Sequence, residues 1–188
     1  MPSPLAHIAA GYAVYQIYNL TYRPTPKTSE TANATVPVTL CIGASLLPDV
    51  DAALGLLLGD FGRLHNQGTH SLFVGLAVAL AVAGIMQVAR RQNAMHWAAL
   101  TFICYALHLF MDSLTTGRGV MLLWPFSTER FLSPVSLFQG VHWSRGWANA
   151  ITVGTVMSEL PVVLLAIGLM IIRQRLYRIP EAEGTPCA

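Results

Sequence analysis

Charged residues are scarce in this chain of 188 residues, because Asp, Glu, Lys and Arg together make up only 11% of it. Soluble globular domains carry about 25% charged residues. Hydrophobic residues reach 54% of the chain, and the mean hydropathy is +0.52. These values exclude a soluble globule and a disordered chain, and they leave a polytopic membrane protein. The length is enough for one domain.

Cysteine is scarce as well, and the net charge is small. Three cysteines that lie far apart, Cys41, Cys104 and Cys187, exclude a disulfide framework and a CxxC metal site. A formal net charge of +2 lacks the basic excess of a nucleic-acid-binding protein, so we expect no nucleic-acid partner. The N-terminus lacks the basic stretch and the small-residue cleavage site of a signal peptide, so we expect the first apolar segment to be retained.

Long apolar runs dominate what is present. A membrane-spanning helix needs roughly 20 mostly apolar residues. The candidate segments are residues 4–20, 36–58, 70–89, 95–113 and 150–172. They predict an all-α, polytopic bundle of about five transmembrane helices, or four if the weakest segment, 4–20, does not span.

The remaining segments divide the predicted bundle. We expect one domain over residues 1–178, followed by a tail at 179–188. Residues 21–35 read as a polar cytoplasmic linker. Residues 114–149 mix apolar stretches with Gly, Pro, Trp and Arg, and we expect them to form an interfacial or re-entrant segment on the outer side.

The distribution of basic residues predicts the orientation, since cytoplasmic loops of membrane proteins are enriched in Lys and Arg. Basic residues follow the first, third and fifth segments, which predicts a multi-pass membrane protein with its N-terminus outside and its C-terminus in the cytoplasm. Four arginines oppose this orientation. They are Arg63, Arg118, Arg130 and Arg145.

Ionisable side chains occur where a lipid-exposed helix would not tolerate them. They are His7, Asp49, Asp51, His65, His70, His108, Asp112 and Glu159. In the predicted topology all of them fall at the outer side. Ionisable groups within a membrane domain are costly and indicate a functional site by default.

The spacing of these residues favours a metal site. His108 and Asp112 lie four residues apart and therefore share one helix face. Asp49 and Asp51 would lie on opposite faces of a continuous helix, but Pro48 predicts an interruption there. Imidazole and carboxylate ligands suit Zn²⁺ or another divalent transition metal, and we expect one to three ions. A single histidine at a helix end more often lies at the interface or makes a hydrogen bond, which is how we interpret His96. The same interpretation leads for His142, for which a ligand role stays open.

Several motifs carry a family resemblance. They read PLAHIAAGY at 4–12, LLPDVD at 46–51, LHNQGTHSL at 64–72, LHLFMDSLTTGRGVMLLWPFSTERFLSP at 107–134 and MSELPVVLL at 157–165. In this order they resemble the YdjM/YbcI family of inner-membrane, LexA-associated proteins, for which metal-dependent hydrolase activity is predicted. The chain departs from the family pattern at Ala6, where the family usually has Thr, and at Asn66, where it usually has Arg.

The same succession of motifs is similar, more distantly, to zinc-dependent phospholipase C and nuclease P1. That likeness implies metal ligation by His7, Asp49, His70, His108 and Asp112, with Asp112 able to bridge two ions. His65, Asp51 and Glu159 would be further ligands or residues that orient the ligands. From the resemblances and the chemistry together we assign the metal to His7, Asp49, His65, His70, His108 and Asp112, and catalytic roles to Asp49, Asp51 and Glu159.

We therefore expect a metal-dependent hydrolase with its site at the extracytoplasmic face, acting on a phosphoester of a membrane lipid or lipid-linked substrate. Arg118, Arg130 and Arg145 would bind the anionic group, or they would only contact interfacial phosphates. Three alternatives stay open: a metal-ion or proton-coupled transporter, a haem-binding electron carrier, and a non-catalytic scaffold whose protein partner is not readable from the sequence.

Overall fold

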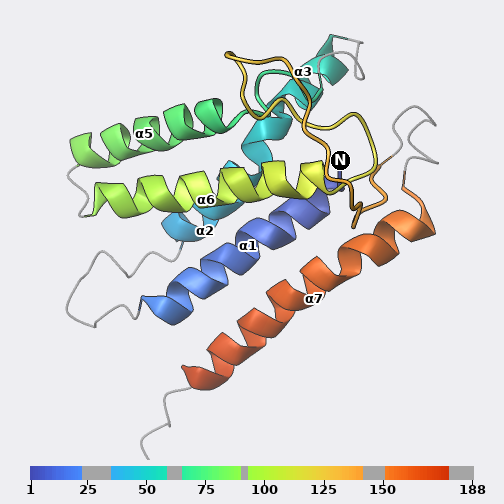
Figure 1. Cartoon of the computed structure of the whole chain (residues 1–188). Coiled ribbons are helices and arrows are strands. Elements are labelled where there is room, and N and C mark those ends of the chain that lie inside the picture. Colours follow the sequence, from blue (N-terminus) through green and yellow to red (C-terminus); the bar gives the residue numbers. More distant parts are fainter. Residues whose placement is uncertain (23–34, 59–64, 90–92, 142–150, 178–188) are drawn as a thin grey trace, which may run out of the picture.

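The computed structural model describes residues 1–22, 35–58, 65–89, 93–141 and 151–177, and within them the chain is all-α (Figure 1). Its helices are α1 (Pro4–Thr21), α2 (Thr35–Leu46), a 3-10 turn (Leu47–Asp49), α3 (Val50–Leu57), α5 (Leu72–Val88), α6 (Ala94–Ser113) and α7 (Val153–Leu176). The described helices match the five predicted apolar segments, with the second segment divided into α2, the 3-10 turn and α3. An all-α bundle is therefore confirmed.

Side-chain caps set the helix starts at the end of the bundle that carries the polar residues. Ser3 caps α1, which then begins with Pro4, a residue well suited to the first helical position. Ser71 caps α5 by accepting a hydrogen bond from the backbone N–H of Phe73. Thr152 and Thr155 form a reciprocal capping box at the start of α7.

The helices pack in an order that places α1 and α6 at the centre. α1 lies against α2 and α7, and α6 lies against α5 and α2 (Figure 1). Small residues allow the close approaches, as is usual between helices in membranes. A Cβ atom at Gly75 of α5 would lie 2.6 Å from the ring of Tyr105 in α6, and one at Gly11 of α1 would lie 2.7 Å from the carbonyl oxygen of Cys41 in α2.

The predicted interruption at Pro48 is confirmed. Pro48 lies in the 3-10 turn Leu47–Asp49, between α2 and α3. The turn changes the path of the backbone, because proline cannot continue an α-helical hydrogen-bond ladder. Asp49 ends the turn and Asp51 begins the next helix, so the two carboxylates are not held on opposite faces of one straight helix.

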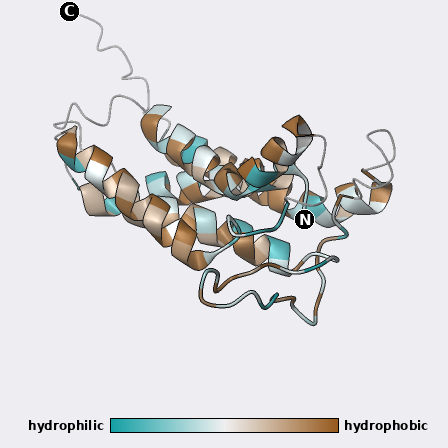
Figure 2. Cartoon of the chain, turned by 90° about the horizontal axis from the view of Figure 1, so that it is seen from above, coloured by the Kyte–Doolittle hydropathy of each residue, from teal (hydrophilic) through white to brown (hydrophobic). Residues whose placement is uncertain are grey.

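Three helical stretches are long and apolar enough to cross a membrane: Thr35–Gly55, Ala94–Ser113 and Val153–Leu176. α5 is apolar but shorter, with 17 residues, and α1 does not reach the same hydropathy. Figure 2 shows many hydrophobic residues along the helices, and a number of large ones are exposed, as lipid contact requires. A helical membrane bundle is thus supported, and the number of five crossings stays a prediction.

Residues 114–141 fold over the end of the bundle where α6 finishes (Figure 1). Isolated bridges join Thr115 to Phe138 and Val120 to Phe131. The rest of the predicted interfacial segment, together with most of the linker 21–35 and the tail 179–188, lies outside the described residues. The proposed extent of a single domain over 1–178 stays a prediction.

Candidate metal centre

Four separate parts of the chain deliver His and Asp side chains to one end of the bundle. His7 lies in the first turns of α1, Asp49 ends the 3-10 turn, and His70 immediately precedes the cap of α5. His108 and Asp112 lie on one face near the end of α6. The break at Pro48 and the short connection before α5 bring residues that are distant in sequence to the same place.

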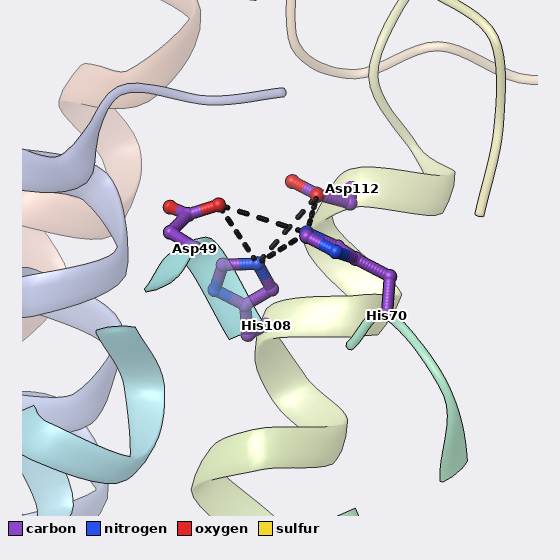
Figure 3. Close-up of side chains that lie close together, drawn as sticks. All are labelled: Asp49, His70, His108 and Asp112. Carbon is purple, nitrogen blue, oxygen red and sulfur yellow. Dashed lines mark hydrogen bonds and ion pairs between the residues drawn. The ribbon is translucent and has the colours of Figure 1, made fainter. Parts of the chain in front are cut away.

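Asp49, His70, His108 and Asp112 form what we call the four-residue cluster (Figure 3). His70 Nε2 and His108 Nε2 lie 3.4 Å apart. Asp112 Oδ2 lies 3.3 Å from His70 Nε2 and 3.5 Å from His108 Nε2. Asp49 Oδ1 lies 3.6 Å from each of the same two nitrogens. Two imidazole nitrogens and two carboxylate oxygens therefore surround one point.

These separations match the dimensions of a zinc site. Zinc binds nitrogen and oxygen at about 2.0–2.2 Å, so the edges of a tetrahedron of ligands around it measure about 3.3–3.6 Å. Octahedral Mg²⁺, with bonds of about 2.0–2.1 Å, would need adjacent ligands about 3.0 Å apart and disfavours imidazole. The cluster has the size and the donor atoms of a tetrahedral transition-metal site.

The two histidine rings are held so that Nε2 of each faces the centre. His108 Nδ1 donates to the carbonyl oxygen of Ser45 at 2.7 Å. His70 Nδ1 lies 3.2 Å from Asp51 Oδ2 and 3.2 Å from Thr69 Oγ1. The Thr69 hydroxyl donates to Asp51 at 2.7 Å, which leaves its oxygen able to accept from His70. Such outer partners fix the tautomer of metal-binding histidines and orient their rings.

Buried polar atoms that lack a hydrogen-bond partner show whether the cluster suits a metal ion. Both carboxylate oxygens of Asp49 and both of Asp112 are buried and unpartnered. Buried polar groups normally have hydrogen-bond partners, and among the described residues these four oxygens have only imidazole rings near them. A cation at the centre would satisfy one oxygen of each carboxylate. The donor set and its unsatisfied atoms therefore fit a divalent metal ion.

The electrostatics of His70 show how strongly this place attracts positive charge. Carboxylate oxygens of Asp112, Asp49 and Asp51 lie 3.3, 3.6 and 3.2 Å from its ring nitrogens. The same carboxylates would attract a metal cation, which competes with the proton for the imidazole nitrogen.

Asp51 and His65 form a second feature beside the cluster, which we call the Asp51–His65 pair. Asp51 Oδ1 lies 3.0 Å from His65 Nδ1. Asp51 Oδ2 also accepts from the backbone N–H of Gln67 at 3.3 Å. The pair and the two shared residues Asp49 and His70 make a second group of potential metal ligands. In this group Asp51 is already satisfied by hydrogen bonds, and His65 Nε2 is buried without a partner.

His7 lies beside the cluster rather than within it. Its Nε2 is 3.4 Å from Asp112 Oδ1, on the opposite carboxylate oxygen from the one that faces His70. Its ring stacks on His108 with centroids 3.8 Å apart. The side chain is completely buried, and neither ring nitrogen has a hydrogen-bond partner. His7 therefore presents an unused donor or acceptor next to the centre.

The loop between His65 and His70 is braced by residues 118–130. Arg130 donates to the carbonyl oxygens of Asn66 at 3.0 Å and Gly119 at 3.1 Å. Arg118 donates to the carbonyl oxygen of His65 at 3.4 Å. Asn66 has a positive φ of 60°. The two arginines thus contact the metal-site loop, while Arg145 and His142 lie outside the described residues.

Aromatic side chains complete this support. The Tyr105 hydroxyl donates to the carbonyl oxygen of Thr69, next to His70. A Cβ atom at Gly68 would lie 3.0 Å from the ring of Trp124, a tight contact that would require the ring to shift slightly. Sequence reasoning did not identify Ser45, Thr69 or Tyr105 as site residues. Only Thr69 had a visible signal, its place directly before His70 in the GTH motif.

Glu159 of α7 lies apart from the cluster. Its carboxylate accepts hydrogen bonds from the backbone N–H and the hydroxyl of Ser3, each at 2.5 Å. Ser3 caps α1, the helix that carries His7. Glu159 therefore connects α7 to the start of α1, and the catalytic role expected for it from the sequence stays a prediction.

Comparison with known proteins places the chain in a family: it belongs to the YdjM inner membrane protein family, whose model matches residues 1–178. The chain is also 30% identical over 142 residues to the inner membrane protein YbcI of Escherichia coli strain K12, across 70% of this chain and 80% of that protein. No solved structure matches the chain. The resemblance to the YdjM/YbcI family is confirmed, as is an inner-membrane family, whereas the more distant likeness to phospholipase C and nuclease P1 receives no support.

Proposed function

We propose that this member of the YdjM family is a metal-dependent hydrolase whose centre is the four-residue cluster. One observation carries the proposal. The four carboxylate oxygens of Asp49 and Asp112 are buried without a hydrogen-bond partner, and they lie next to two imidazoles whose orientation is fixed. Zinc is the favoured metal because the separations within the cluster suit tetrahedral ligation by nitrogen and oxygen. Another divalent transition metal is the alternative.

Each residue then has a defined task. Asp49, His70, His108 and Asp112 hold the ion, while Asp51 and the Ser45 carbonyl orient the two imidazoles. When bound, the metal supplies Lewis-acid activation of water and of the bond to be cleaved. The unpartnered imidazole of His7 and the adjacent Asp112 Oδ1 are placed to hydrogen-bond to a water molecule or to the substrate.

The substrate class follows from the position of the centre and the charges near it. The cluster lies at one end of a membrane bundle, next to the loop that carries Arg118 and Arg130. Guanidinium groups favour phosphate by charge-assisted hydrogen bonds. We therefore favour a phosphoester of a membrane lipid or of a lipid-linked molecule, reached from the headgroup region. Arg145 stays a further candidate for binding the phosphate.

We infer from the distribution of Lys and Arg that this end of the bundle faces the extracytoplasmic side. A transporter is less favoured, because its binding site is expected near the middle of the membrane rather than at one end. A scaffold that binds metal without catalysis shares the same cluster, so the experiment must separate metal binding from turnover.

The first experiment measures the metal content of detergent-purified protein by elemental analysis. The wild type is compared with the double variant His108→Ala, Asp112→Ala. His96→Ala is the matched control, since it removes a histidine at the other end of the same helix. We expect stoichiometric zinc in the wild type and the control, and none in the double variant. Absence of metal from all three, with no effect of added zinc, would overturn the proposal.

The second experiment tests turnover with two probes. Phospholipid vesicles and the soluble diester bis-p-nitrophenyl phosphate are each incubated with the zinc-loaded protein. Hydrolysis of the lipid that is lost in the double variant supports a lipid phosphoesterase. Stoichiometric metal without hydrolysis of either probe favours the non-catalytic scaffold.

A further inference from the structure

Residues 121–138 carry a surface that the metal centre does not use. Large apolar side chains project from it into solvent, and Phe126 is 78% exposed. The others include Leu123, Trp124, Phe131, Val135 and Leu137. Exposed apolar patches of this kind mark an interaction surface. In Figure 2 the segment protrudes from the helices as a loop with several hydrophobic residues.

This apolar surface continues the membrane-facing side of α5. Phe126 packs edge-on against Phe73 in the first turn of α5, with ring centroids 4.8 Å apart. Phe73, Leu76 and Leu80 are all exposed and follow one another at helical spacing, so they share one outward face. An outward apolar face on a helix of an inner-membrane protein contacts lipid. The loop extends that face beyond the start of α5.

The polar part of the loop suits the headgroup region. Arg130 is in direct contact with neutral carbonyl groups, those of Asn66 and Gly119. Arg118 donates to the carbonyl oxygen of His65, next to Asn66, so two cationic groups lie close together on this loop. A pair of cations beside exposed Trp and Phe side chains is the composition found where proteins meet the membrane–water interface.

We propose that residues 121–138 form a lipid-docking surface, seated in the headgroup region of the leaflet at the metal-site end of the bundle, with phospholipid as its occupant. Phe126 and Val135 enter the lipid, and Arg130 lies at the level of the phosphates. The same loop braces His65 and Asn66, so lipid at its surface lies next to the candidate metal centre. This proposal does not depend on hydrolase activity.

Spin labels on the full-length protein test the proposal in nanodiscs of phosphatidylethanolamine and phosphatidylglycerol. Cys187→Ser provides the background, because Cys41 and Cys104 are completely buried. Labels are placed at Phe126→Cys and Val135→Cys, with Leu137→Cys as a substitute if either variant fails to fold. Leu80→Cys on α5 is the lipid-exposed reference, and Gln174→Cys, exposed near the end of α7, is the water-exposed reference.

The readout compares relaxation by oxygen, which partitions into lipid, with relaxation by a water-soluble nickel chelate. We expect the labels at 126 and 135 to resemble Leu80→Cys, with oxygen more effective than nickel, and to differ from Gln174→Cys. A pattern like that of Gln174→Cys would show a water-exposed loop and overturn the proposal. Protection from both reagents would indicate a protein partner or a second copy of the chain, and would overturn it equally.

Discussion

Two acidic groups, two residues apart in the chain, have opposite surroundings. Asp49 lies in the four-residue cluster, and both of its carboxylate oxygens are buried without a hydrogen-bond partner. Asp51 accepts hydrogen bonds from His65, the Gln67 backbone and Thr69, and it also lies next to His70 Nδ1. An unsatisfied carboxylate is ready for a cation, whereas a saturated one holds its neighbours in place. The comparison therefore separates residues that bind metal from residues that orient the ligands.

The same contrast divides the two groups of potential ligands. Both include Asp49 and His70, but only the four-residue cluster combines unpartnered carboxylates with imidazoles whose Nδ1 atoms are already engaged. If His70 gives its Nδ1 hydrogen to Asp51 and Thr69, only its Nε2 can bind a metal. One ion in the cluster, with the Asp51–His65 pair outside it, is the arrangement that this geometry favours.

The largest effect is expected from Asp112→Asn, which keeps the shape of a cluster ligand and removes its charge. Loss of an outer partner typically weakens metal affinity about 10–100-fold, so loss of a ligand should exceed about 100-fold. Competition with a chromophoric zinc chelator measures the change. Retention of wild-type affinity would show that Asp112 is not a ligand and that the cluster is not the metal centre.

Asp51→Asn should have a smaller effect on the same measurement. The asparagine retains the size of the side chain but lacks the charge that orients His70, and we expect affinity to fall about 10–100-fold with one ion still bound at saturation. Glu129→Gln, which neutralises an exposed acid on the loop, is the control and should leave affinity unchanged. A loss of zinc affinity as large as that of Asp112→Asn would show that Asp51 is a metal ligand, as Asp49 is, and not a residue that only orients His70.

His65→Ala tests, through the number of zinc ions bound per chain, whether the Asp51–His65 pair binds a metal of its own. If the Asp51–His65 pair only supports the cluster, the variant binds one ion per chain, as the wild type does. Because His65 acts through Asp51, its loss should reduce affinity by less than the about 10–100-fold expected for an outer partner. Elemental analysis at saturating zinc gives the count. Two ions in the wild type and one in His65→Ala would instead establish a second metal site in the group that contains His65.

Much of this centre could be predicted from the residues. Ionisable side chains in apolar segments indicated a site, the i, i+4 spacing placed His108 and Asp112 on one face, and Pro48 indicated that Asp49 and Asp51 need not oppose each other. The structure brings these residues together because the predictions of their positions depend on helix periodicity and on the high cost of burying charge in a membrane.

The sequence could not predict which residues of the centre face the ion and which orient the ligands. Whether Asp49 or Asp51 faces the ion depends on how the loop from His65 to His70 returns to the helices, and no local pattern encodes that path. Ser45 contributes a backbone carbonyl, a group that every residue has, so its identity carries no signal. Glu159 has the residue type of a catalytic acid, yet it accepts its hydrogen bonds from Ser3, a contact between the two ends of the chain.

The smallest effect on metal binding is expected at that contact. In the wild type, the two oxygens of Glu159 accept one hydrogen bond each from the backbone N–H and the hydroxyl of Ser3. Glu159→Gln keeps only one side-chain oxygen, so one of these two buried donors loses its acceptor. Such a loss costs about 1–3 kcal/mol of stability. We therefore expect Glu159→Gln to lower the midpoint of thermal unfolding in detergent, with zinc stoichiometry unchanged and zinc affinity within about threefold of the wild type. Ser3→Ala should lower the midpoint similarly. Because both changes remove the same contact, the double variant should be little worse than either single one. Loss of zinc from Glu159→Gln, with a normal unfolding midpoint, would instead place Glu159 with Asp49 among the residues that bind the metal.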